Sequence, residues 1–212
     1  MKKIFFFLTS FIALDVQAHP VSFQDSMGIM GYHNPKMSHL QLNYSWKYWL
    51  ATGLHHFSIR PRSQDKVKNA NFFSTNLVLK RWNGSNYQAN LYTILGAGRS
   101  DISGSTQDAG LGVFQFDIED RKYYFLTKYA HIQNPDDAEL KQTTVRIGLA
   151  PYVGGFDDIH SWFILEWQKN NIINSKVDED VTSYLRFFYE NVLFEIGYSF
   201  DGNAKFNYIT HF

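Results

Sequence analysis

The sequence predicts an all-β fold, an antiparallel transmembrane barrel of about twelve strands that follows a short export segment. Three observations predict it: apolar and polar side chains alternate along many segments, turn residues separate these segments, and aromatic residues make up 17% of a chain without cysteine. Strict alternation gives a strand two chemically different faces. A barrel with lipid outside and an aqueous or ion-paired space inside satisfies both faces.

The first 18 residues have the pattern of a secretory signal peptide. Lys2 and Lys3 form a positive start, residues 4–14 are apolar, and Val16-Gln17-Ala18 fits a small-x-Ala cleavage site. An apolar run of about eleven residues is too short to span a bilayer of roughly 30 Å. We therefore expect export, cleavage after Ala18 and a barrel over residues 19–212.

The alternating segments define the expected strands. Five alternate cleanly: 39–46, 86–97, 114–119, 162–167 and 192–200. Seven less regular ones complete the set: 26–33, 48–60, 71–82, 121–132, 142–152, 180–190 and 204–212. Their connections fall into a mostly longer, more polar set and a mostly tight set, as expected when alternate connections lie at opposite ends of a barrel. Ten or fourteen strands remain alternatives.

A soluble β-sandwich or lipocalin-like barrel is the competing fold. Its outward faces should carry charge, whereas the face expected to point outward here is aromatic and aliphatic over four or five successive positions. Burying the other, polar face in a dry core would leave many groups unpaired, at about 1–3 kcal/mol each. The membrane barrel avoids this cost and is the fold we expect.

In the last strand, every second residue points to the same face, and the side chains on this face are mostly aromatic: Phe206, Tyr208, Thr210 and Phe212. This pattern resembles the C-terminal signature strand of Gram-negative outer-membrane β-barrels, in which a terminal Phe is part of the signal read by the barrel assembly machinery. The resemblance implies an outer-membrane location, Phe212 as an assembly signal, and the assembly machinery, membrane lipid and lipopolysaccharide as partners. It identifies no narrower family.

Charged side chains on the polar face of the expected strands give the leading functional hypothesis. Successive strands contribute six of them, mostly with alternating sign: Asp117, Lys128, Arg146, Glu166, Arg186 and Glu195. Such a series either fills a narrow lumen with ion pairs or lines a water path and sets its selectivity. Twelve strands fall between barrels with filled interiors and barrels with open channels. The sequence therefore predicts a narrow pore or solute-binding barrel, with a purely structural network as the alternative.

A second hypothesis is metal handling, as in copper or silver resistance. Thioether and imidazole ligands gather near the mature N-terminus, at His19, Met27, Met30, His33, Met37 and His39. Thioethers favour Cu(I), and His19 with a free α-amine would hold Cu(II). The alternative is that the methionines are ordinary lipid-facing surface and the histidines amphipathic side chains at the membrane boundary.

A third hypothesis is a lipid-modifying enzyme. His56-Phe57-Ser58 places an imidazole and a hydroxyl on one strand face, but no acidic partner is evident in the sequence. Asp158-Ile159-His160 resembles the Asp-x-His element of omptin proteases, yet we expect it beside a turn at the wrong end of the barrel. The balance of 20 basic and 20 acidic residues argues against nucleic acid as a partner, because neutralising phosphates requires a basic face.

Overall fold

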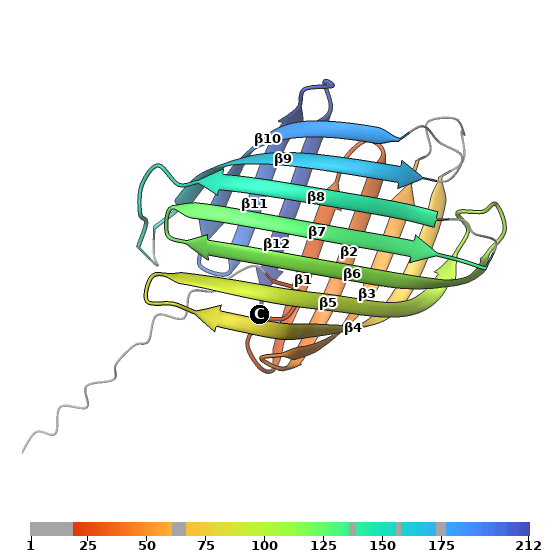
Figure 1. Ribbon diagram of the computed structural model, residues 1–212, viewed down its shortest axis with the longest axis horizontal. Coiled ribbons are helices and arrows are strands. Elements are labelled where there is room, and N and C mark those ends of the chain that lie inside the picture. Colours follow the sequence, from red (N-terminus) through yellow and green to blue (C-terminus); the bar gives the residue numbers. More distant parts are fainter. Residues whose placement is uncertain (1–18, 61–66, 136–138, 156–157, 173–176) are drawn as a thin grey trace, which may run out of the picture.

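The computed structural model describes residues 19–60, 67–135, 139–155, 158–172 and 177–212, so the expected signal peptide lies outside the described residues. Within these described ranges, twelve strands form one closed barrel (Figure 1). They are β1 Ser26–His33, β2 Met37–Lys47, β3 Leu50–Ile59, β4 Lys68–Asn83, β5 Tyr87–Ser100, β6 Gln107–Asp120, β7 Tyr123–Gln133, β8 Glu139–Leu149, β9 His160–Ile172, β10 Asp178–Tyr189, β11 Val192–Ser199 and β12 Ala204–His211. The predicted all-β class and strand number are confirmed.

Every strand pairs antiparallel with its neighbours in the chain, and β1 pairs with β12 to close the sheet. The backbones of Met27 and Phe212 exchange two hydrogen bonds at this seam, of 3.0 and 2.8 Å. We call the end that holds the connections after odd-numbered strands the loop end. The turn end holds the connections after even-numbered strands and both ends of the described chain.

The two faces of the wall differ as the alternation predicts. Apolar side chains such as Leu54, Phe73 and Phe163 stand outside, each more than half exposed. Polar side chains such as Asn76 and Asp117 point inward and are fully buried. This division confirms the predicted parity and rules out the sandwich, because a soluble fold would not expose its apolar face around the whole wall.

Aromatic side chains form a girdle around the turn end of the exterior. Its members are Trp46, Tyr48, Trp49, Trp82, Tyr87, Tyr123, Tyr152 and Tyr189. Amphipathic rings at this level, beside an apolar band, are typical of barrels that cross a bilayer. The described residues contain no helix long and apolar enough to cross a membrane. The closed sheet and its lipid-facing exterior define the class: a transmembrane β-barrel.

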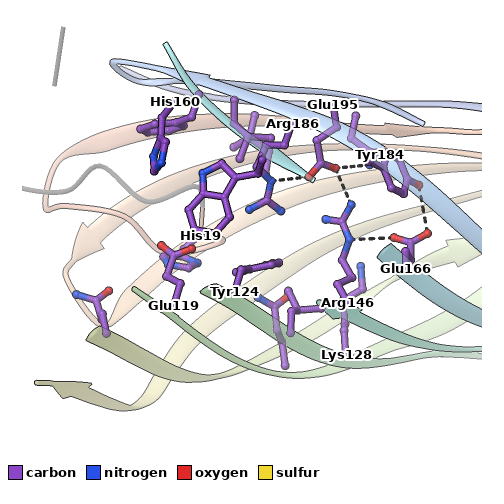
Figure 2. Close-up of a pocket in the computed structure, with 18 of the residues that line it drawn as sticks. His19, Glu119, Tyr124, Lys128, Arg146, His160, Glu166, Tyr184, Arg186 and Glu195 are labelled. Carbon is purple, nitrogen blue, oxygen red and sulfur yellow. Dashed lines mark hydrogen bonds and ion pairs between the residues drawn. The ribbon is translucent and has the colours of Figure 1, made fainter. Parts of the chain in front are cut away.

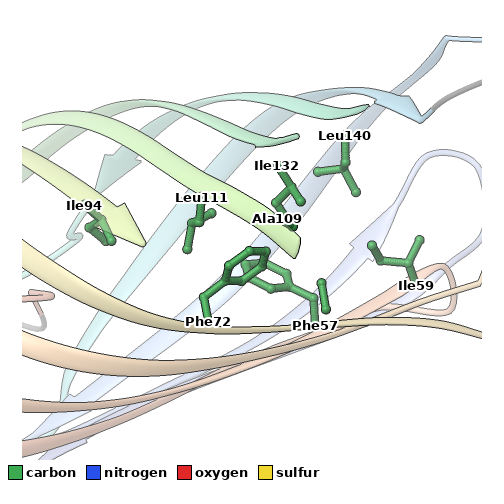
Figure 3. Packing of buried hydrophobic residues seen from close by; sticks show 9 residues of the cluster. Phe57, Ile59, Phe72, Ile94, Ala109, Leu111, Ile132 and Leu140 are labelled. Carbon is green, nitrogen blue, oxygen red and sulfur yellow. The ribbon is translucent and has the colours of Figure 1, made fainter. Parts of the chain in front are cut away.

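The interior is itself divided. Near the loop end, inward side chains of β3 to β8 form an apolar cluster (Figure 3) made of Phe57, Ile59, Ala70, Phe72, Ile94, Ala109, Leu111, Ile132 and Leu140. The wall made by β8 to β12 instead carries charged residues in its middle. The apolar cluster stabilises the barrel from within, and the ionic half forms the candidate site.

Candidate functional site

Four charged side chains on β8 to β11 form the centre of an ionic network inside the barrel (Figure 2). Arg146 Nη2 lies 2.7 Å from Glu195 Oε2, and Arg186 Nε lies 2.7 Å from Glu195 Oε1. Arg146 Nε lies 3.1 Å from Glu166 Oε2. Arg146 thus bridges two carboxylates, and Glu195 bridges two guanidinium groups.

Strand register explains why these charges meet. Arg146 is the direct cross-strand partner of Glu166, and Arg186 is that of Glu195. Directly opposed side chains on one face lie about 4.5–5.5 Å apart at Cβ, which suits an ion pair. The alternating signs along the sequence therefore become adjacent opposite charges in the barrel wall.

A second layer of contacts completes the network. Lys205 Nζ lies 3.0 Å from Asp180 Oδ2 and 3.4 Å from Glu166 Oε1. The Tyr184 hydroxyl donates to Glu166 Oε1 at 3.2 Å, and Asn207 Nδ2 donates to Glu195 Oε2 at 2.7 Å. Lys205 and Asp180 were not among the six predicted lumen charges.

Asp117 lies apart from this network, nearer the turn end. It accepts hydrogen bonds from Asn90 Nδ2 at 2.9 Å and Gln115 Nε2 at 3.0 Å, and His19 Nδ1 lies 3.7 Å from its Oδ2. His19 enters the lumen from the turn end, and its carbonyl is 3.2 Å from His211 Nε2. Burial lowers the pKa of His19 to about 4, although the Asp117 carboxylate opposes this shift. The chain preceding β1 thus occupies part of the interior.

A cavity of about 880 Å³ runs beside the network. Its wall includes His19 and Pro20, the charged centre, and aromatic rings of Tyr32, Tyr124 and Trp162. Lys128 lines the cavity and lies 5.2 Å from the centre of the Tyr32 ring. Within the described part of the chain, no carboxylate forms an ion pair with Lys128.

All six predicted lumen residues point inward. Five of them have a carboxylate, guanidinium or imidazole partner, and Lys128 is the exception.

The six predicted metal ligands do not meet at one point. Met27 stands outside and is 53% exposed, whereas Met30 is buried inside. His33 bonds the Ser38 hydroxyl at 2.7 Å, and the His39 ring stacks on Phe57 with centroids 3.9 Å apart. Met37 packs against the apolar cluster, and His19 lies beside Asp117. Across the described ranges, no group of three or more His, Cys, Asp or Glu side chains is placed to hold a metal.

The two sequence elements considered for catalysis have different surroundings. At the turn end, His160 Nε2 lies 3.0 Å from the Tyr152 carbonyl, and Asp158 accepts the Gly155 amide at 2.9 Å, so both hold the β8–β9 connection. On the exterior, His56 Nδ1 lies 2.8 Å from Asn71 Oδ1. This amide partner was missed because only the β3–β4 register places Asn71 opposite His56.

No family model matches the chain, and no curated protein matches it. A crystal structure of Pseudomonas aeruginosa OccK5 (OpdH) is similar, with 10% sequence identity and a TM-score of 0.42. The similarity covers 90% of this chain and 62% of that one, so the chain spans less than two thirds of that protein's length.

Proposed function

We propose that the protein is an outer-membrane barrel of a Gram-negative bacterium that binds or conducts a small anionic solute through its charged lumen. The observation that carries the proposal is Lys128, a cation on the cavity wall with no ion-pair partner among the described residues. The membrane-facing exterior and the resemblance of the terminal strand support the location.

The chemistry of the cavity favours an anion over a cation. The central carboxylates Glu166 and Glu195 are already bound by arginine or lysine, so they offer little free charge. Lys128 keeps donors available, and a carboxylate or phosphate oxygen would give it a charge-assisted hydrogen bond. Tyr32 and Tyr124 provide aromatic surface for the rest of a small solute.

Ion selectivity tests this proposal. The purified full-length protein is placed in planar bilayers, and reversal potentials are measured in a salt gradient alongside calorimetric titration with acetate and inorganic phosphate. We expect Lys128→Met to reduce anion preference or anion affinity at least tenfold, and Lys128→Arg to retain it. Lys169→Met is the matched control, because Lys169 is an exposed lysine paired with Glu179 at 2.9 Å. Equal behaviour of Lys128→Met and wild type contradicts the proposal.

Phe212 is proposed as the assembly signal, supported by its place at the barrel seam. Its backbone pairs with Met27 and its side chain is exposed on the outside. We expect Phe212→Ala to lower the amount of folded protein in the outer membrane more than Phe206→Ala, which removes another outward ring from the same strand. Equal amounts of the two variants in isolated membranes contradict this role.

A further inference from the structure

Four polar side chains interrupt the apolar exterior of β3 and β4 near the loop end. His56 and Ser58 stand on the outward face of β3, and their direct partners on β4 are Asn71 and Asn69. Polar groups facing hydrocarbon are costly, and ionisable residues within a membrane are functional candidates by default. Two adjacent cross-strand pairs of this kind therefore need a reason to be there.

The contact between His56 and Asn71 orients the imidazole. His56 Nδ1 donates to Asn71 Oδ1 at 2.8 Å, since the amide oxygen can only accept. This tautomer leaves Nε2 unprotonated, with its lone pair available as a base. A histidine fixed at one nitrogen by a third group is the arrangement that activates a hydroxyl nucleophile.

Ser58 is the hydroxyl on the same face. It lies two residues from His56, which places the two Cα atoms about 6.6 Å apart along an extended strand. Both side chains project outward, and Ser58 is partly buried while His56 is exposed. The β3–β4 pair thus brings together a base, a nucleophile and an orienting amide: His56, Ser58 and Asn71.

An apolar groove lies directly beside the imidazole. It has a volume of about 400 Å³ and is lined on the outside by Leu40, Leu42, Leu54, Phe73, His56 and Asn71. Because this part of the wall faces lipid, the groove's natural occupant is the acyl chain of a membrane lipid. His56 and Asn71 line the groove, and the next cross-strand pair, Ser58 and Asn69, follows toward the loop end. An ester group of a lipid whose acyl chain fills the groove would therefore lie next to these polar side chains.

We propose that His56, Ser58 and Asn71 form a site that hydrolyses acyl ester bonds of membrane lipids on the outer wall of the barrel. Ser58 Oγ attacks the ester carbonyl carbon while His56 Nε2 takes the hydroxyl proton. Collapse of the tetrahedral intermediate breaks the bond to the alcohol oxygen, which leaves with that proton and gives an acyl-serine. Water then attacks the acyl-serine, again through His56, and the products are a fatty acid and regenerated Ser58.

Two neighbouring side chains are placed to support this reaction. Asn69 is the direct partner of Ser58, so its amide group is a candidate donor to the developing oxyanion. Arg60 follows two residues after Ser58 on the same face and is exposed. Its guanidinium is suited to the phosphate of a lipid headgroup. The site is on the opposite face of the wall from the lumen, so it is independent of the proposed solute site.

The test uses the full-length protein in mixed micelles of detergent and dioleoylphosphatidylglycerol, with released fatty acid measured by mass spectrometry. A fluorophosphonate probe reports the nucleophile by covalent labelling. We expect wild-type hydrolysis and labelling of Ser58, and a loss of roughly 10⁴-fold or to background in Ser58→Ala and His56→Ala. Asn71→Ala should lose at least tenfold, and Asn71→Asp should recover part of that loss because the acceptor oxygen is restored.

Ser38→Ala is the matched control. Ser38 is the partner of Ser58 on β2 but bonds His33, so its removal should leave hydrolysis unchanged. All variants are first shown to be folded by their protease resistance. Absence of hydrolysis and labelling in the folded wild type, or activity retained in Ser58→Ala, overturns the proposal. Lys128→Met should leave hydrolysis unchanged, so the two proposals fail separately.

Discussion

Glu195 holds two arginines that reach it from different strands. Its two carboxylate oxygens lie 2.7 Å from Arg146 Nη2 and 2.7 Å from Arg186 Nε, and only 1% of its side chain is exposed. Asn207 adds a hydrogen bond to the same carboxylate. A buried carboxylate in this position neutralises two cations at once, so its loss leaves both without full compensation.

We therefore expect Glu195→Gln to destabilise the barrel by about 3–5 kcal/mol, the usual cost of removing one partner from a buried ion pair. Urea-induced unfolding in detergent micelles measures the change. Glu179→Gln is the control, because Glu179 forms an exposed pair with Lys169 at 2.9 Å, and exposed pairs contribute about 0–1 kcal/mol. Similar losses of unfolding free energy in the two variants would show that the buried network stabilises the barrel no more than an exposed ion pair does.

Gly197 on β11 allows Tyr184 to reach the network. A Cβ atom at Gly197 would lie 2.4 Å from the Tyr184 ring, whose hydroxyl donates to Glu166 at 3.2 Å. Gly197→Ala should displace the ring and cost about 1–3 kcal/mol, as overpacking does in other interiors. The control is Gly110→Ala, where a Cβ meets nothing within 4 Å. Near-ultraviolet circular dichroism and unfolding curves report the difference, and equal stability of the two variants contradicts the role of Gly197.

Acid should loosen the segment that contains His19. Its pKa in the folded protein is lowered to about 4 by burial, from an ordinary value of 6.5. Between these values the unfolded chain binds a proton that the folded chain does not, so stability falls as the pH falls from 6.5 to 4. The contribution is about 3 kcal/mol at most. The charged or titratable groups that act on this imidazole are Asp117, which raises its pKa, and Arg81, His211 and Arg186, which lower it.

Unfolding free energies at pH 7 and pH 4.5 test this expectation. His19→Gln keeps a polar side chain but cannot be protonated, so its stability should change less with pH than that of the wild type. A pH dependence that is the same in both proteins assigns the effect to other groups.

Much of the fold could be predicted from the sequence because alternation is a local property. Residues such as Phe163 and Glu166 show their opposite faces within one segment, and the strand number follows from counting such segments. The same parity placed the six lumen charges on the inner face. What alternation cannot give is register, since a shift of two residues keeps the faces but changes every partner.

The parts of the candidate sites that were missed depend on that register or on long-range packing. Asn71 becomes the partner of His56 only through the β3–β4 pairing. Lys205 joins Asp180 and Glu166 across strands that are distant in sequence. Met27 and Met30 are three residues apart, so their side chains point to opposite sides of the wall and the predicted metal ligands diverge.

The residues before β1 have a thermodynamic consequence for any guest of the lumen. His19 and Pro20 form part of the cavity wall while remaining covalently attached to the barrel. A tethered group of this kind acts at an effective concentration in the millimolar range. His19 and Pro20 would thus compete with any guest that needs the same space. Such a guest must displace them before its full intrinsic affinity is expressed.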